Sequence, residues 1–545
     1  MKNMKKFAAM MAALTLSACS IAPMAMTASA ATITINGVST EQAHTFEVYQ
    51  VFTGDFNSET KEFTNLKWGS GVASYNDTAV TPNALVDSSI VDALGAVDAD
   101  AREFAKKIVT SNTKACEDVV SVNGVATTDD LANGYYIIKD VTNLDGKDDA
   151  NSAYIVQVAD NQTIAIKNEK PTVDKQVLDE TADAETNATS NTLSDMAGSW
   201  GESADHAINE TFQFKLTATI PADKNLAAYE TYELVFTDSM SSGVTFDSIE
   251  KVLVNGTAIT SGYSETATDA TSKAGLSWSL TIEDVKAIVN ADGADVFGKS
   301  EFTVDVIYNA HLNENAIVDK ADQTEGTPDN TNNNNVYLEY SNNPDHLGSG
   351  TNEKGKTPTD YVWVFTYGVD NTKYELEQKA GNQLAGAKFS LHNGSADGAK
   401  INVIWNADKN AYVLAKEGDI SEGVTDVLES QNGATNKGTF NIIGLDAGTY
   451  YLVEDEAPTG YNTVAPIEIV ISAEHSETNK ESENVTMTLK NDSKNMVNNP
   501  VDTKTSSLPS TGGMGTTLFY LGGGAMVAVA GVFLITKKRM GRSEN

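Results

Sequence analysis

The sequence predicts an all-β protein built from several β-sandwich domains in tandem. Short segments in which apolar and polar residues alternate, such as 211–216, 232–236 and 485–489, recur between turns rich in glycine, asparagine and aspartate. Alternation with a period of two is typical of strands with one buried face, whereas helical patterning is confined to short stretches such as 101–109. The length of 545 residues, at roughly 100–200 residues per domain, is enough for three or four such domains.

The composition excludes several classes of function. Asp and Glu number 75 against 38 Lys and Arg, which gives a formal net charge of −37. Such a polyanion repels phosphate backbones, so no nucleic-acid partner is expected. The two cysteines, Cys19 and Cys116, and the six scattered histidines leave little for a zinc site or a Ser/His nucleophile. The acidic turn at 145–149 lacks the spacing of a calcium-binding loop, so no metal and no cofactor are expected.

The N-terminus has the pattern of a secretory signal peptide, residues 1–30. Basic residues precede an apolar run from Phe7 to about Pro23, and Ala28-Ser29-Ala30 supplies a small-residue cleavage site. An alternative lies inside the apolar run, because Leu16-Ser17-Ala18-Cys19 resembles a lipobox with Cys19 as the acylated residue. Either processing route predicts that the protein is exported.

The C-terminus, 508–545, combines three elements in a fixed order. Leu508-Pro509-Ser510-Thr511-Gly512 precedes an apolar stretch at 513–536, long enough to cross a bilayer as a helix, and a basic tail follows. This order resembles the LPxTG sorting signal of Gram-positive wall proteins, which the transpeptidase sortase cuts between threonine and glycine, here Thr511 and Gly512. The resemblance implies transient retention by the transmembrane helix and then attachment to peptidoglycan. A simple tail anchor is the alternative.

Strand patterning fades near 167–171 and in the polar stretch 342–358, which divides the exported chain into three modules. The expected segments are an N-terminal sandwich, a middle sandwich, a C-terminal sandwich and a wall-spanning linker, at residues 31–166, 167–345, 360–492 and 493–507.

Residues 450–461 of the third module read YYLVEDEAPTGY. This segment resembles the E-box of sortase-assembled pilins, Y-x-L-x-E-T-x-A-P-x-G-Y, with Asp455 in place of threonine. In that family the glutamate, here Glu454, catalyses an intramolecular isopeptide bond between a lysine of the first strand and an asparagine of the last. The reaction needs a neutral amine and a protonated carboxyl, and burial favours both states.

Strand parity selects the partners of Glu454, since alternate residues share one face of a strand. Lys373 is in phase with Tyr367 on the expected first strand, and Asn491 is in phase with Leu489 on the last. We therefore expect a Lys373–Asn491 bond with Glu454 as catalyst. The alternative is that Glu454 is an exposed acid and Lys373 a solvated strand end.

The middle module shows the same arrangement with an aspartate as the acid. Lys175 lies on its opening strand, and Asp238 lies in a segment that resembles the catalytic-Asp strand of the middle domain of these pilins. Asn342 is in phase with Tyr340 on the expected last strand, so the expected bond is Lys175–Asn342, catalysed by Asp238. Asn334 has the same phase and remains an alternative acceptor.

The first module lacks this combination of lysine and acid, and no isopeptide bond is expected there. Its opening strand, 32–38, carries no lysine, and Lys139 stands where the similar segment of the third module has Glu454. At its end, Ile164-Ala165-Ile166-Lys167-Asn168 resembles the pilin motif V-Y-P-K-N, with Ala-Ile in place of Tyr-Pro. In the family this lysine attacks the acyl-sortase of another subunit, which implies that Lys167 is the polymerisation residue; Lys170 is the alternative.

The resemblance spans nearly the whole chain and is to SpaA-like major pilins, with immunoglobulin-like sandwiches of the CnaA and CnaB types. It implies a shaft subunit, joined head to tail through Lys167 and Thr511, that performs only self-catalysed bond formation and is not an enzyme. The implied partners are further copies of the chain, pilus-class and housekeeping sortases, peptidoglycan, minor pilins and a host-surface ligand. The alternatives are a monomeric wall-anchored adhesin or minor pilin and a wall-anchored glycosidase, for which no pair of acids stands out.

Overall fold

The structure, a computed structural model, describes residues 31–57, 59–60, 62–93, 104–166, 169–180, 198–267, 275–318, 332–344, 353–477, 485–490, 497–498 and 501–502. Strands dominate these ranges, and the helices α2 (Ser88–Ala93), α4 (Val285–Val289), η3 (Lys224–Ala228) and η4 (Ala291–Gly293) are short. The predicted all-β class is therefore confirmed. No helix within the described ranges is long and apolar enough to cross a membrane.

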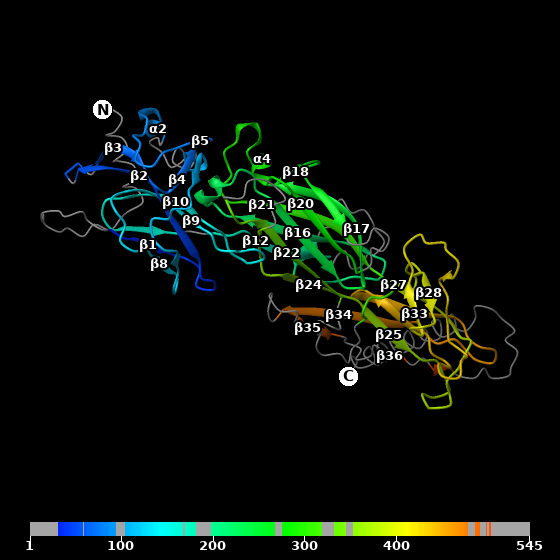
Figure 1. Cartoon of the computed structure of the whole chain (residues 1–545). Helices are drawn as coiled ribbons and strands as arrows, with labels where there is room; N and C mark the ends of the chain where they lie inside the picture. Colours follow the sequence, from blue (N-terminus) through cyan, green and yellow to red (C-terminus); the bar gives the residue numbers. More distant parts are fainter. Residues whose placement is uncertain are drawn as a thin grey trace, which may run out of the picture.

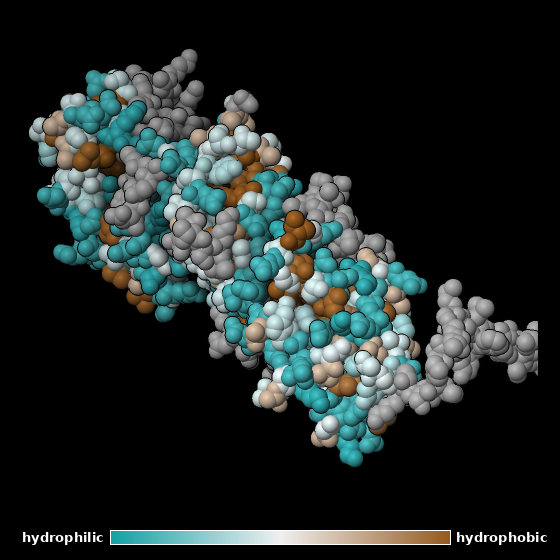
Figure 2. All heavy atoms as spheres, turned by 90° about the vertical axis from the view of Figure 1, so that its right-hand side faces the viewer, coloured by the Kyte–Doolittle hydropathy of each residue, from teal (hydrophilic) through white to brown (hydrophobic). Residues whose placement is uncertain are grey.

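Several predicted segments lie outside the described residues. They are the signal peptide, Lys167, Asn491, most of the linker, and the whole sorting signal with its apolar stretch. The described part forms three β-rich bodies in a row, which we call the first, middle and third modules (Figure 1). Hydrophilic residues cover most of the face shown in Figure 2, in keeping with the net charge of −37.

The first module has two hydrophobic clusters and three small sheets. The sheets run in the order β11-β1-β8, β10-β9-β2-β3 with β7 beside β2, and β5-β4-β6. The strand bounds are β1 (Ile33–Asn36), β2 (Thr45–Asn57), β3 (Glu62–Trp68), β4 (Val72–Tyr75), β5 (Thr78–Ala79), β6 (Ile108–Thr110), β7 (Val119–Val120), β8 (Val125–Thr127), β9 (Gly134–Asp140), β10 (Ala153–Val158) and β11 (Gln162–Ala165).

The middle module is a sandwich of two large sheets, with the orders β13-β12-β15-β21-β17-β18 and β14-β24-β22-β16-β20-β19, and β23 beside β22. The strand bounds are β12 (Thr172–Glu180), β13 (Gly198–Gly201), β14 (Ser203–Asp205), β15 (Thr211–Ile220), β16 (Leu234–Met240), β17 (Val244–Val254), β18 (Thr257–Ile259), β19 (Ser264–Ala267), β20 (Ser277–Ile282), β21 (Phe302–Leu312), β22 (Asn332–Ser341), β23 (Lys354–Lys356) and β24 (Asp360–Phe365).

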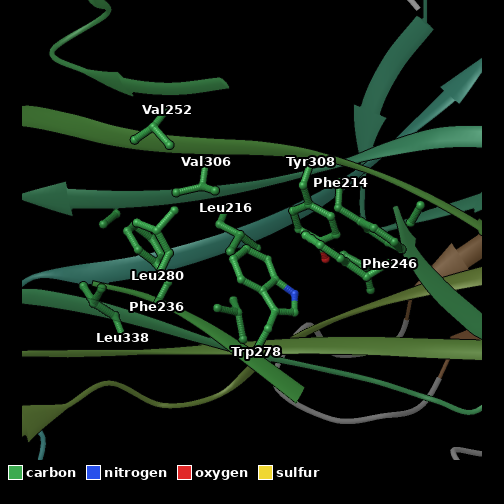
Figure 3. Packing of buried hydrophobic residues seen from close by; sticks show 14 of the residues in the cluster. Phe214, Leu216, Phe236, Phe246, Val252, Trp278, Leu280, Val306, Tyr308 and Leu338 are labelled. Atoms are coloured by element: carbon green, nitrogen blue, oxygen red, sulfur yellow. The ribbon is translucent and has the colours of Figure 1, made fainter. Parts of the chain in front are cut away.

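Alternation places the core of this module between the two sheets. On β15, Phe214 and Leu216 are fully buried, while the residue between them is half-buried. Figure 3 shows these side chains and Tyr308 on one side of the core and Trp278 on the other, with the rings of Trp278 and Tyr308 edge to face at 5.1 Å. The core is therefore dense and aromatic around Tyr308.

The third module has the sheet orders β30-β28-β29-β32-β25-β36, β31-β27-β33-β34-β35 and β26-β37. The strand bounds are β25 (Tyr367–Asn371), β26 (Tyr374–Glu375), β27 (Lys388–Asn393), β28 (Val403–Asn406), β29 (Ala411–Leu414), β30 (Val424–Thr425), β31 (Leu428–Glu429), β32 (Asn441–Leu445), β33 (Gly448–Glu456), β34 (Ile467–Glu477), β35 (Val485–Lys490), β36 (Val497–Asn498) and β37 (Val501–Asp502).

Strand β24 joins the middle and third modules. It pairs with β22 and β14 in a sheet of the middle module. Val362 and Val364 pack in the middle core, whereas Trp363 and Phe365 pack in the core of the third module. Because successive side chains of a strand point to opposite faces, this one strand contributes side chains to both cores.

The loop at 141–152 joins the first and middle modules. Asn342 lies beyond the end of β22. Its side-chain Nδ2 donates to the backbone carbonyl oxygens of Leu144 (3.0 Å) and Asp149 (3.2 Å). Its backbone carbonyl accepts from the backbone amide of Asn151 at 2.7 Å. The Gly146 amide donates to the carbonyl of Lys354 on β23 at 2.8 Å. Backbone and side-chain hydrogen bonds thus hold the loop against the middle module.

Replacing Asn342 with alanine should loosen this junction without unfolding the middle core. The change leaves two buried carbonyl oxygens without their amide donor, which costs about 1–3 kcal/mol. We expect faster hydrogen exchange in residues 143–151, with unchanged exchange in β16 and β22. The control is Asn315→Ala at an exposed position. Equal exchange in both variants would contradict this role of Asn342.

Candidate cross-linking sites

A buried lysine–aspartate pair joins the two sheets of the middle module. Lys175 on β12 and Asp238 on β16 are both 0% exposed, and Lys175 Nζ contacts Asp238 Oδ2 directly. The lysine nitrogen also lies 5.0 Å from the ring centre of Phe214 and 5.3 Å from that of Tyr308. Because β12 and β16 belong to different sheets, the pair spans the sandwich.

Burial moves both members of this pair toward their neutral forms. It lowers the pKa of Lys175, although the charge of Asp238 opposes the shift. It raises the pKa of Asp238, against the effect of Lys175. These two pKa shifts favour a neutral amine beside a protonated carboxyl, which are the protonation states that attack on an amide requires.

Tyr308 and Asn334 complete this site. The Tyr308 hydroxyl accepts from Lys175 Nζ at 3.0 Å and from Asn334 Nδ2 at 2.6 Å, and it donates to Asp238 Oδ2 at 3.0 Å. Asn334 is fully buried on β22, in the same sheet as Asp238. The structure therefore brings together the lysine, the aspartate and the alternative asparagine, through a tyrosine that the sequence reasoning missed.

Asn342 does not reach this site. It lies eight residues beyond Asn334 along the chain, roughly 26 Å at the usual rise of a strand. Its side-chain amide is bound to the loop of the first module instead. Strand parity predicts the same face for both asparagines but not their position along the strand. In the structure Asn334, not the expected Asn342, shares the partner Tyr308 with Lys175.

The third module also has a buried lysine–acid pair. Lys373 follows β25 and is 0% exposed, and Glu454 on β33 in the facing sheet is 5% exposed. Lys373 Nζ lies 3.0 Å from Glu454 Oε1 and 3.1 Å from Oε2, and the Val464 amide donates to Oε2 at 2.7 Å. The nitrogen also lies 5.2 Å from the ring centre of Phe389. The alternative of an exposed glutamate and a solvated lysine is therefore wrong.

The last strands of the third module run beside Lys373. Strand β36 pairs in parallel with β25, with Asn498 opposite Asn371, and β37 pairs with β26, with Val501 opposite Tyr374. Lys373 lies between these two pairings. Strand β35 ends at Lys490, opposite Ser472 of β34. The expected acceptor Asn491 lies outside the described residues, and Asn498 is the asparagine whose backbone pairs beside β25.

The first module buries a different charged cluster. Lys139 on β9 is half-buried, and the buried charge belongs to His44, whose ring nitrogens lie 2.7 Å from Asp140 and 3.1 Å from Asp149. Burial alone would lower the pKa of His44, but the hydrogen bonds and charges of the two aspartates raise it to about 9. The pKa of Asp149 is lowered, although burial opposes this shift and His44 causes it. An ionic contact thus holds Asp149 in the loop that binds the middle module.

Comparisons with known proteins agree with this architecture. Residues 371–486 match the SpaA model of a prealbumin-like fold domain, and residues 500–540 match the LPXTG cell wall anchor motif. No curated protein matches the chain.

Three similar solved structures share 16–17% sequence identity with this chain. The full-length major pilin SpaD from Corynebacterium diphtheriae is 17% identical, with 88% of this chain and 98% of that chain covered and a TM-score of 0.44. The T6 backbone pilin of Streptococcus pyogenes serotype M6 is 17% identical, with coverages of 87% and 98% and a TM-score of 0.47. The full-length RrgB pilus protein of Streptococcus pneumoniae is 16% identical, with coverages of 89% and 99% and a TM-score of 0.41.

The matched models and the fold together define a β-sandwich surface protein of the Gram-positive cell wall. Within it, residues 371–486 are a SpaA-type prealbumin-like domain, and the segment that follows carries the wall anchor. The predicted sandwich fold and the predicted anchoring at the cell wall are confirmed.

The His44 cluster should make the first module less stable at alkaline pH. A histidine pKa raised from 6.5 to about 9 in the folded state contributes stability that is complete below about pH 6.5 and disappears as the pH rises through 9. The shift corresponds to about 3 kcal/mol. The thermal midpoint of the first module should fall over this range, and His44→Gln should flatten the dependence, whereas the control His311→Gln in the middle module should not. A flat wild-type profile would contradict the ionic role of His44.

Proposed function

We propose that this protein is the major, shaft-forming subunit of a sortase-assembled pilus, with modules at residues 31–166, 167–345 and 360–492, the last two of which share β24. Two kinds of observation support the proposal. The chain carries a cell-wall anchor motif, and two modules each bury a lysine against an acid from the facing sheet. The buried pairs are the stronger support, since simple wall anchoring requires neither of them.

In the middle module, Lys175 would attack the side-chain amide of Asn334, with Asp238 as the catalytic acid. The lysine nitrogen forms a bond to the amide carbon, the bond to the amide nitrogen breaks, and ammonia leaves. The contacts of Tyr308 with all three residues support Asn334 over Asn342. The product is an amide that links the two sheets, and it replaces a buried pair of ionisable groups with a neutral bond.

In the third module, Lys373 would form the equivalent bond with catalysis by Glu454. The sequence favours Asn491 as the acceptor, and the pairing of β36 with β25 favours Asn498. Both asparagines are near the end of the module, so either bond ties its first strand to its last. The two bonds together would stiffen the chain between its ends.

Polymerisation would join subunits through two further atoms. Sortase would hold the Thr511 carbonyl as a thioester, and the amine of Lys167 from another subunit would displace it. In the sequence Lys167 follows β11 by two residues, at the proposed boundary between the first and middle modules, and such boundaries usually fall in exposed segments. The same Thr511 carbonyl would attach the last subunit to peptidoglycan.

The mass of the secreted ectodomain tests the internal bonds. It should be lower than the sequence mass by two ammonias, because each bond expels one. Asp238→Ala and Glu454→Ala should each restore one ammonia and lower the thermal stability of their own module by several kcal/mol, roughly 4–5 for a cross-link that closes a long loop. Peptide mapping would identify Asn334, Asn491 or Asn498. A full-sequence mass would refute the internal bonds.

Covalent ladders in boiled cell-wall extracts test polymerisation. Lys167→Arg should abolish the ladders and leave the monomer exported and wall-anchored, because arginine retains the charge but is not a competent nucleophile. The matched control is Lys170→Arg, whose wild-type side chain binds Asp148 at 2.9 Å. Ladders that survive Lys167→Arg and vanish in the control would assign the role to Lys170. A wild type without ladders would favour the monomeric adhesin.

A further inference from the structure

The Tyr308 hydroxyl occupies the centre of the middle site and touches every group of the reaction. It contacts the attacking nitrogen at 3.0 Å, the leaving nitrogen of Asn334 at 2.6 Å and the carboxyl of Asp238 at 3.0 Å. Two of these contacts are accepted and one is donated, so the hydroxyl uses its full hydrogen-bonding capacity. Packing against Trp278, Phe214 and Phe246 fixes its ring in this position.

We propose that Tyr308 is a second catalytic residue of the middle module, beside Asp238, and that it carries a proton from Lys175 to the departing amide nitrogen of Asn334. This inference rests on the proposed formation of the Lys175–Asn334 bond. It goes beyond the lysine, acid and asparagine that the resemblance to pilins implies.

The reaction needs such a relay because its two nitrogens must exchange a proton. When neutral Lys175 attacks, its nitrogen becomes positively charged and must lose a hydrogen. The nitrogen of Asn334 must gain one, since ammonia leaves far more readily than an amide anion. Asp238 supplies the proton that polarises the amide oxygen, and this proton returns to it when the carbonyl re-forms.

The positions of the atoms allow Tyr308 to connect the two nitrogens directly. Its oxygen accepts the proton from Lys175 Nζ while its own hydrogen, which points to Asp238 before the reaction, turns to Asn334 Nδ2. The bond between the amide carbon and Nδ2 then breaks, and ammonia departs. Tyr308 ends with the same number of protons as at the start, so no further reactant is needed.

The surroundings of Tyr308 favour a concerted transfer. Burial, together with the charge of Asp238, raises the pKa of Tyr308 well above its usual value of 10. A free phenolate is therefore strongly disfavoured in this site. The hydroxyl can pass a proton only by receiving one as it gives one, which matches its simultaneous contacts with both nitrogens.

The test measures the rate at which each ammonia is lost. The mature chain, residues 31–511, is made by cell-free synthesis, samples are quenched in acid, and intact masses with peptide mapping assign each loss to its module. Tyr308→Phe keeps the ring and removes the hydroxyl. We expect loss from the middle module to slow about 10²–10⁴-fold, the usual contribution of proton transfer by a positioned side chain. Loss from the third module is the internal reference and should not change.

The matched control is Tyr232→Phe, which removes a hydroxyl from another fully buried tyrosine of the same core, packed on Tyr229 and Phe297. It should leave both rates as in the wild type. In case Tyr308→Phe fails to fold, 3-fluorotyrosine placed at position 308 keeps the shape and the hydroxyl but changes its acidity. The relay predicts an altered rate and pH profile for the middle module, whereas a packing role predicts neither.

The outcomes separate this inference from the proposed function. A wild-type middle module that never loses ammonia would overturn both. Ammonia loss at equal rates in the wild type, Tyr308→Phe and the fluorotyrosine protein would overturn the relay alone and leave the Lys175–Asn334 bond in place. Slow loss confined to the middle module of the Tyr308 variants would support the relay.

Discussion

A lysine nitrogen that is completely removed from water needs a partner, because an isolated buried charge costs several kcal/mol or more. The middle module meets this requirement with Lys175 and Asp238, which approach each other from facing sheets. The surrounding aromatic rings exclude water, and their packing fixes the distance between the sheets. The contact forms only if sheet order and strand register bring the two residues to the same position and the surrounding core excludes water.

Each of the three modules buries ionisable side chains, and the partners differ between modules. The middle module pairs lysine with aspartate, the third pairs lysine with glutamate, and the first pairs His44 with two aspartates. The histidine cluster has no lysine nucleophile, so it remains an ionic contact. It nevertheless holds Asp149 in the loop that binds Asn342, and thereby contributes to the junction with the middle module.

The two connections between the modules differ in kind. Strand β24 packs against two cores with its alternate side chains, so the middle and third modules cannot separate without exposing one of them to water. The first junction depends on hydrogen bonds of a loop, which are individually weaker than the burial of a shared strand. Cross-links within the modules would complement these joints, since bonds between sheets resist shearing inside each body.

The sequence by itself determined the all-β class, the anchor and the lysine–acid pairs Lys175–Asp238 and Lys373–Glu454, because period-two patterns and short motifs are local properties of a chain. Only the tertiary structure decided that Asn334 rather than Asn342 shares the Tyr308 hydroxyl with Lys175, and that β24 packs in two cores. Parity along a strand specifies which face a residue occupies. The height at which it meets a residue of another strand depends on register, and register is set by pairing between segments far apart in the sequence.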